Sequence, residues 1–258
     1  MQIGFFDSGI GGLTVLHDAL NMLPQEDYIY YADTLNVPYG SKTKADVKQY
    51  VFAAADFIVK KEVKALVIAC NTGTSVAIED LRMKYPHIPI IGMEPAIKPA
   101  LKNHINKRIL VTATPLTLKE EKLKNLITTL DNENMIDLLP LPGLVHFAEK
   151  FEFDKQIILH YLSEQLSGFD LDHYGTLVLG CTHFTFYKDV FTELLPAQIN
   201  IIDGNKGTVA NLKRTLERLN RTDEGTGQIT FYHSNQKVCA TEALERYSHL
   251  LKRLDQIN

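Results

Sequence analysis

The 258-residue sequence has few cysteines, no excess of positive charge and no long apolar run, and each shortage excludes a class of protein. Its three cysteines, Cys70, Cys181 and Cys239, are too few and too far apart for the disulfide framework of a small secreted domain. The formal net charge of −4 lacks the basic excess of a typical nucleic-acid-binding protein. No run approaches the roughly 18 apolar residues of a membrane-spanning helix. The first residues also lack the basic and apolar regions of a signal peptide, so we expect a cytoplasmic protein with reduced thiols.

What the sequence does have is the composition of an ordinary globular protein. Hydrophobic residues make up 45% of it and charged residues 22%, which is enough to bury a core in one large or two medium domains. Apolar runs of strand length alternate with segments of helical spacing, as in βαβ units with a mainly parallel sheet. We expect strands over residues 2–6, 27–32, 65–69, 88–91, 108–111, 135–140, 176–181, 199–202 and 228–232. We expect helices over residues 13–23, 43–61, 76–84, 95–103, 116–130, 144–151, 154–167, 184–194, 207–220 and 237–254.

The second half of the chain repeats the pattern of the first. A polar loop follows the first strand of each half, over 7–12 and 112–115, and a cysteine follows a later strand of each, at Cys70 and Cys181. We therefore predict an α/β protein of two similar three-layer domains with mainly parallel sheets. The first domain comprises residues 1–94 and 205–258 and the second residues 95–204, with the active site in the cleft between them.

Cys70 and Cys181 each stand at the carboxyl end of an apolar strand, where open α/β sheets bind ligands. A single buried cysteine is commonly a packing residue, and Cys239, in a late helix pattern, is interpreted in that way. Two cysteines at matching strand ends instead indicate a site with a thiol on each side. A helix N-terminus directly after each thiol would lower its pKa and raise the thiolate fraction. His183 is close enough to Cys181 to polarise it or to act as an acid.

Other interpretations of these residues stay open. The glycines at 9, 11 and 12 match no nucleotide-binding motif, and they fit either a tight turn or backbone N–H groups that bind a carboxylate. A zinc site made by Cys70, Cys181 and His183 is an alternative, although no CxxC motif supports it. Glu149, in an apolar helix pattern, either orients a histidine or faces solvent.

Four motifs together resemble, in order and spacing, those of the bacterial glutamate racemases. They are Asp7-Ser8-Gly9-Ile10-Gly11-Gly12, Pro38-Tyr39-Gly40, Cys70-Asn71-Thr72 and Gly180-Cys181-Thr182-His183. The resemblance runs from residue 2 to residue 235. It implies membership of the cofactor-independent aspartate/glutamate racemases, with interconversion of L- and D-glutamate that supplies D-glutamate for peptidoglycan. It implies neither a cofactor nor a metal.

The resemblance also implies a role for each site residue. Cys70 is expected to remove the α-proton from D-glutamate with help from Asp7, and Cys181 from L-glutamate with help from His183. Glu149 is expected as a further acidic helper, because Pro142 fits the family's local pattern there, although Gly143 and His146 depart from it. Substrate contacts are expected from Ser8, Pro38, Tyr39, Gly40, Asn71, Thr72, Thr114 and Thr182. The chain also departs from the family at Gly73, where alanine is usual, and at Asn36, where arginine is common.

Two thiols suit this chemistry because racemisation removes a proton from one face of a carbon and returns one to the other. We expect glutamate as the small-molecule partner, no nucleic acid or membrane, and a homodimer. One alternative is a racemase of the same family that acts on aspartate or another amino acid. A second is a cysteine hydrolase that uses Cys181 and His183 and leaves Cys70 without a role. A third is a two-domain binding module for an amino acid or a protein.

Overall fold

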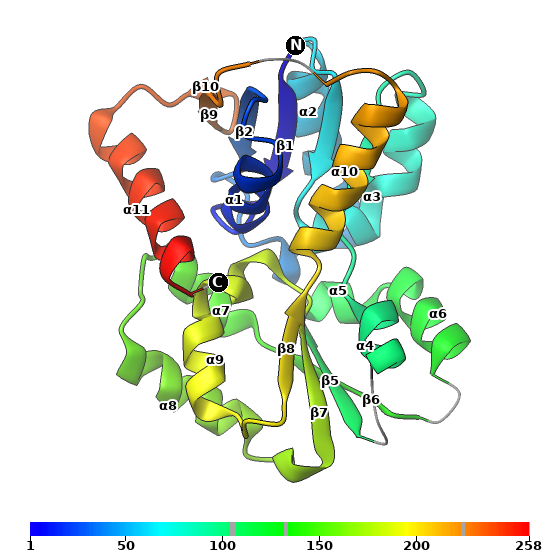
Figure 1. The fold of residues 1–258 in the computed structure, drawn as a ribbon, viewed down its shortest axis with the longest axis vertical. Helices are drawn as coiled ribbons and strands as arrows, with labels where there is room; N and C mark the ends of the chain where they lie inside the picture. The colour runs from blue at the N-terminus through cyan, green and yellow to red at the C-terminus, as the bar shows by residue number, and fades with distance from the viewer. Residues whose placement is uncertain (104–106, 132–133, 223–224, 258) are drawn as a thin grey trace.

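The computed structural model describes residues 1–103, 107–131, 134–222 and 225–257. They form an α/β protein with two sheets, one in each half of the molecule (Figure 1). The larger sheet has the strand order β10-β9-β2-β1-β3-β4 and the smaller one β6-β5-β7-β8. Within the described residues, all strand pairs are parallel except β10 with β9. The predicted fold class is therefore confirmed.

The elements divide between the two sheets as follows. The larger sheet contains β1 (Ile3–Asp7), β2 (Tyr28–Ala32), β3 (Ala65–Ile68), β4 (Ile90–Gly92), β9 (Ile229–His233) and β10 (Gln236–Lys237). With it go α1 (Leu13–Met22), α2 (Lys44–Val59), α3 (Asn71–Lys84), α10 (Asn205–Arg218) and α11 (Thr241–Ile257). The smaller sheet contains β5 (Arg108–Ala113), β6 (Ile136–Pro140), β7 (Tyr174–Leu179) and β8 (Asn200–Asp203). With it go α4 (Ile97–Asn103), α5 (Pro115–Lys119), α6 (Glu121–Leu130), α7 (Pro142–Glu149), α8 (Lys155–Leu166) and α9 (Lys188–Leu194). Three short 3-10 helices are η1 (Tyr39–Ser41), η2 (Leu171–His173) and η3 (Thr182–Tyr187).

The order of the strands carries the repeat seen in the sequence. The run β2-β1-β3-β4 has the same relative order as β6-β5-β7-β8. In each run the first strand along the chain is central, so its carboxyl end lies beside that of the strand that precedes a cysteine. The predicted boundaries, 1–94 with 205–258 and 95–204, stay a prediction of which residues move together.

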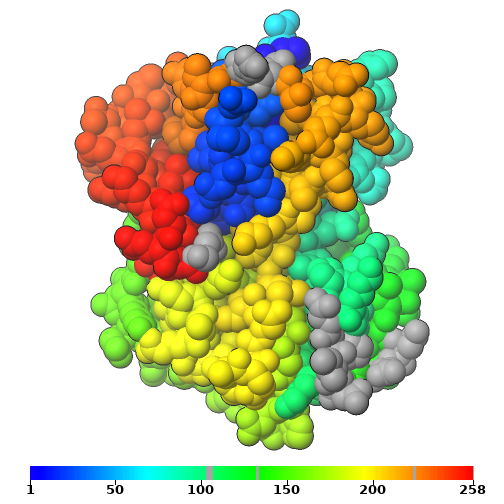
Figure 2. All heavy atoms as spheres, viewed as in Figure 1, coloured from blue at the N-terminus to red at the C-terminus, as the bar shows by residue number. Residues whose placement is uncertain are grey.

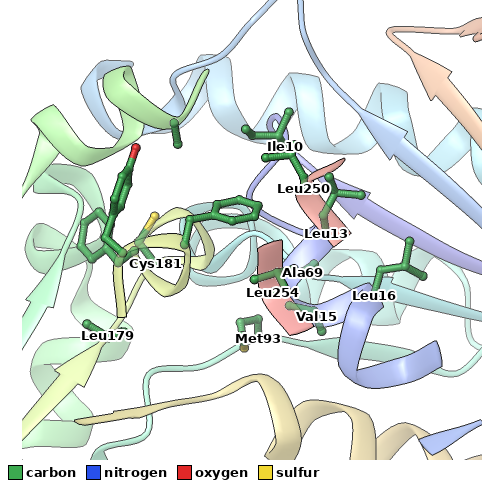
Figure 3. Packing of buried hydrophobic residues seen from close by; sticks show 14 of the residues in the cluster. Ile10, Leu13, Val15, Leu16, Ala69, Met93, Leu179, Cys181, Leu250 and Leu254 are labelled. Carbon is green, nitrogen blue, oxygen red and sulfur yellow. The ribbon is translucent and has the colours of Figure 1, made fainter. Parts of the chain in front are cut away.

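The two halves share one hydrophobic cluster near α1. Leu13 and Leu16 of α1 are buried in it together with Leu250 and Leu254 of α11 (Figure 3). The cluster also includes Cys181, so apolar packing continues to the second thiol. Burial of one such leucine contributes about 1.5–3 kcal/mol. Figure 2 shows the N-terminal residues of this face lying between α10 and α11.

Several predicted elements differ in the structure. The helix expected over 116–130 is two helices, because Glu120 takes an extended conformation between α5 and α6. The helix expected over 76–84 begins earlier, at Asn71, and the segment after Cys181 is the 3-10 helix η3 before α9 begins. The last expected helix is shifted, since β10 precedes α11. Cys239 lies between them and is exposed, so its interpretation as a packing residue is wrong.

A membrane-spanning helix is not found in the described part of the chain, where none is both long and apolar enough.

Candidate active site

Cys70 and Cys181 line one small cavity, each from a different half of the molecule. Cys70 follows β3 of the larger sheet and Cys181 follows β7 of the smaller one, and their exposed fractions are 5% and 6%. The other lining residues are Ser8, Tyr39, Gly40, Asn71, Thr72, Thr114, Val145, Thr182 and His183. The cavity volume of about 10 Å³ is close to the minimum that holds one water molecule. The structure thus brings together nearly all of the residues expected to bind or react.

The environment of Cys70 favours the protonated thiol. Its sulfur donates to Ser8 Oγ at 3.6 Å and accepts from the Gly73 N–H at 3.3 Å at the start of α3. Burial and the nearby charge of Asp7 nevertheless raise the pKa of Cys70 to about 12. The expectation that the helix N-terminus lowers the pKa is therefore wrong for Cys70, because desolvation of the thiolate costs more than the helix N-terminus returns.

Asp7 lies at the end of β1 and is fully buried. Its Oδ1 accepts from the Gly9 N–H at 2.9 Å, and its Oδ2 accepts from Thr182 Oγ1 at 3.1 Å. Burial raises the pKa of Asp7 to about 6, although the charge of His183 and the hydrogen bond from Gly9 oppose this shift. Because Thr182 belongs to the other half, this carboxyl group connects the two halves behind the cavity.

His183 connects Cys181 to Glu149. Its Nδ1 is 3.7 Å from the Cys181 sulfur, and its Nε2 is 2.6 Å from Glu149 Oε1. Burial lowers the pKa of His183, but hydrogen bonds to Cys181 and Glu149 and the negative charges of both raise it well above its usual value overall. An imidazolium therefore lies beside the second thiol. Glu149 orients this histidine, as one of the two interpretations of its position expected.

The glycine loop after β1 supports both interpretations given for it. The Ile10 N–H donates to Glu149 Oε1 at 2.8 Å, so the loop does bind a carboxylate, and that carboxylate comes from the chain itself. The loop is also a tight turn before α1. A Cβ at Gly9 would clash with Glu149, and one at Gly11 would clash with His183 and Thr182, so the close approach of the two halves requires glycine at both positions.

The remaining predicted residues hold the rim of the cavity. Pro38 precedes η1, whose Tyr39 is buried, and Gly40 approaches Thr114 so closely that a Cβ on it would lie 2.6 Å from the Thr114 Cβ. Thr72 Oγ1 is 2.9 Å from Thr114 Oγ1. The buried Asn71 Oδ1 has no hydrogen-bond partner among the residues that the structure describes.

Thr117 is a site residue that the sequence analysis missed. Its hydroxyl oxygen is 3.1 Å from that of Thr72 and 2.9 Å from that of Thr114, which makes a triangle of three hydroxyls across the two halves. Thr114 caps α5 and accepts from the Thr117 N–H. The three-residue spacing after a capping threonine was the available signal.

The zinc alternative gains no support from the geometry. Within residues 1–103, 107–131, 134–222 and 225–257, no group of three or more His, Cys, Asp and Glu side chains is placed to hold a metal ion.

Comparison with known proteins identifies the class to which this site belongs. The family model for Asp/Glu/Hydantoin racemase matches residues 14–212. The chain belongs to the Asp/Glu/hydantoin racemase family, and it is an enzyme of this class.

The relatives narrow the comparison to one kind of racemase. The chain is 54% identical to the glutamate racemase of Halothermothrix orenii over 256 residues, covering 98% of this chain and 100% of that protein. It is 53% identical to glutamate racemase 2 of Bacillus subtilis over 258 residues, covering 99% and 97%. The fold is similar to that of Escherichia coli glutamate racemase, solved with L-glutamate and the activator UDP-MurNAc-ala, with a TM-score of 0.84, 28% identity and coverage of 98% and 95%. The resemblance to glutamate racemases expected from the four motifs is confirmed.

Proposed function

We propose that this chain is a glutamate racemase that interconverts L- and D-glutamate with two cysteine bases and without a cofactor. One observation carries the proposal: Cys70 and Cys181 line the same cavity from opposite halves of the molecule. Full-length similarity to glutamate racemases supports glutamate as the substrate. Two similar structures, from Escherichia coli and Francisella tularensis, are described as complexes with L-glutamate and D-glutamate.

In the direction from L- to D-glutamate, Cys181 starts as the thiolate and Cys70 as the thiol. The Cys181 sulfur takes the α-proton, and the electron pair of the broken C–H bond stays on Cα. Cys70 then gives its proton to the opposite face, which leaves Cys181 as the thiol and Cys70 as the thiolate. The imidazolium of His183, held by Glu149, stabilises the starting thiolate. The pKa of about 12 at Cys70 fits the thiol that this direction requires.

The reverse direction requires ionised Cys70, and we assign Asp7 and the substrate to that task. The pKa of Cys70 is raised by burial and by the Asp7 charge, so a positive charge placed beside both groups offsets the penalty. The α-ammonium group of glutamate supplies that charge, and the Asp7 carboxylate accepts the thiol proton. Asp7 and His183 are thus the partners of Cys70 and Cys181.

The polar groups around the cavity fit the two carboxylates and the ammonium group of glutamate. Hydroxyls of Ser8, Thr72, Thr114 and Thr182 and the Tyr39–Gly40 backbone face it, and the unpartnered Asn71 Oδ1 accepts from an ammonium group. Fixed donors stabilise the negative charge that develops on the carbanion. A cavity with so little space for water strengthens these interactions.

We place this activity in the cytoplasm, where thiols stay reduced, and assign it the supply of D-glutamate for peptidoglycan. We propose a homodimer as the assembly, which light scattering would measure. We also propose that residues 1–94 with 205–258 move as one body and residues 95–204 as another when substrate enters.

Exchange of the α-proton in D2O tests the activity. We expect the purified chain to exchange and racemise L- and D-glutamate but not aspartate. Exchange of aspartate alone would support the alternative racemase. No exchange with either glutamate enantiomer would overturn the proposal.

Single-cysteine variants test the two-base assignment. Cys70→Ser and Cys181→Ser should each lower racemisation by roughly 10³-fold or more, because a hydroxyl is a far weaker acid–base group than a thiol. Cys181→Ser should keep more exchange from D-glutamate, and Cys70→Ser more from L-glutamate. The exposed Cys239→Ser is the matched control and should behave as the wild type. Full activity of Cys70→Ser would favour the hydrolase alternative, in which Cys70 has no role.

A further inference from the structure

The C-terminal segment, residues 229–257, contains β9, β10 and α11 and lies beyond the residues that the family model matches. None of the expected site residues lies in it. We propose that this segment positions both walls of the active site, through Ser234 at the Pro38–Gly40 loop and through Arg253 at η3. The inference rests on the proposed function, because it assigns positioning residues to the same site.

Ser234 reaches the substrate loop through one buried carboxylate. Its Oγ donates to Asp33 Oδ1 at 2.8 Å and accepts from the Leu35 N–H at 3.1 Å. Asp33 is buried at the end of β2, and its other oxygen accepts from the Tyr39 hydroxyl at 2.6 Å. A buried carboxylate needs all of its donors. The hydrogen bonds Ser234–Asp33–Tyr39 therefore fix η1, which lines the cavity with Tyr39 and Gly40.

The backbone at Ser234 indicates that its hydroxyl is needed. Ser234 and Asn235 form the two-residue turn between β9 and β10, with φ of 38° and 75°. Such turns favour glycine or asparagine at both positions, because other side chains are strained at positive φ. A serine at the first position keeps this strain and in return contributes the oxygen that joins Asp33 to Leu35.

Arg253 reaches the wall that carries Cys181 and His183. Its Nε and Nη2 donate to the Phe186 carbonyl at 3.2 and 3.0 Å, and Nη2 is 3.2 Å from both Asp189 oxygens. The guanidinium also lies 4.9 Å from the centre of the Phe153 ring. Phe186 belongs to η3, the short helix that begins at Thr182. The planar guanidinium therefore fixes the far end of the segment that orients His183.

The body of α11 connects these two anchors. Figure 1 shows it passing from β9 and β10 toward the smaller sheet, and it packs on both α1 and η3. Leu250 and Leu254 lie near Leu13 in the shared cluster (Figure 3). Higher on the helix, the Tyr247 ring stacks on Phe231 with centroids 4.4 Å apart. One rigid helix thus links the turn at Ser234 to η3.

The Ser234 anchor is tested with Ser234→Gly and Ser234→Ala. Glycine removes the hydroxyl and also relieves the backbone strain, so Ser234→Gly should be at least as stable as the wild type. Both variants should raise KM for both enantiomers by about threefold or more and change kcat less than twofold, since the loop contacts substrate but not the reacting atoms. Gln236→Ala, on the exposed strand β10, is the control and should keep the wild-type KM.

The Arg253 anchor is tested with Arg253→Met and Arg253→Lys. Loss of the guanidinium should lower kcat about tenfold per folded molecule with KM within twofold, because η3 carries the acid–base machinery. Arg253→Lys should recover part of this loss, since one ammonium donor still reaches the Phe186 carbonyl. The exposed neighbour Lys252→Met should match the wild type.

Two results are decisive for this segment. Wild-type KM in Ser234→Gly together with wild-type kcat in Arg253→Met would overturn the inference. A fall in melting temperature with kcat per folded molecule unchanged would also overturn it, because that result describes a structural role only. Failure of the proposed function would appear separately, as a wild-type chain that does not racemise glutamate.

Discussion

Asp7 is the residue at which burial and function oppose each other most directly. It must stay near the cavity to act on Cys70, yet it is fully buried and has only two hydrogen-bond donors, Gly9 and Thr182. Ionising it inside the protein costs stability, and the raised pKa measures that cost. Two buried acids, Asp7 and Cys70, thus disfavour each other's ionisation until a cation arrives between them.

The pKa of Asp7 predicts a specific dependence of stability on pH. The unfolded carboxyl ionises near its ordinary pKa of 3.8, whereas the folded one keeps its proton up to a pKa of about 6. The folded state therefore binds more protons between these values, and the free energy of unfolding falls as pH rises through this window and levels off above it. The loss amounts to at most about 3 kcal/mol.

Asp7→Asn should remove that contribution. Urea unfolding of the wild type and the variant between pH 4 and 8 would measure it, and the variant should gain stability relative to the wild type toward the higher pH. Racemisation by the variant should fall, because the carboxylate that accepts the Cys70 proton is lost. Equal pH slopes for the two proteins would contradict the assignment of the raised pKa to Asp7.

At the scale of elements, the loop 7–12 and the 3-10 helix η3 approach each other more closely than any side chain at Gly11 allows. Gly11→Ala should push η3 away, because the new Cβ would clash with both His183 and Thr182. A displacement of about 1 Å at a catalytic group costs on the order of 100-fold in rate. We expect a loss of that order in kcat/KM, measured by racemisation of L-glutamate.

Gly168→Ala is the matched control, since no atom lies within 4 Å of a Cβ built there. It should keep wild-type kcat/KM. An active Gly11→Ala variant would show that η3 is not held against the glycine loop during catalysis.

The sequence predicted the features that are local to one strand and its loop. The strands before Cys70 and Cys181 are where the apolar runs place them, and the repeat of the two halves appears in the strand order. Capping and breaks were harder, since Glu120 interrupts a helical pattern that has no proline or glycine at that point. The interpretation of Cys239 failed because the helix starts after it, so the helical spacing did not apply.

The rest of the site depends on contacts between residues far apart in the sequence. Asp7 meets Thr182 across 175 residues, and Glu149 meets Ile10 across 139. No local pattern predicts such pairs, and motif resemblance placed Glu149 without showing its partner. The pKa of Cys70 could not be predicted either, because the helix N-terminus is visible in the sequence but the desolvation and the Asp7 charge are not. Ser234 and Arg253 carry no motif at all.

At the scale of the whole molecule, these long-range contacts close the site. Ile10 with Glu149, Asp7 with Thr182, and Thr72 with Thr114 all join one half to the other around a cavity of about 10 Å³. The ion pair between Lys44 and Glu120, at 2.6 Å, adds a further contact between the halves. A five-carbon diacid needs far more space than one water molecule, so the halves must separate and close again in every turnover.

Separation of two α/β bodies displaces solvent, and we therefore expect kcat to fall as sucrose or glycerol raises the viscosity. Racemisation rates of the wild type, plotted against relative viscosity, should show a clear slope. Cys181→Ser is the control: proton transfer limits this slow variant, so its residual exchange should be independent of viscosity. A wild-type kcat that also ignores viscosity would mean that proton transfer, and not opening of the closed cavity, sets the rate. The contacts across the two halves would then break faster than Cys70 and Cys181 exchange protons with Cα.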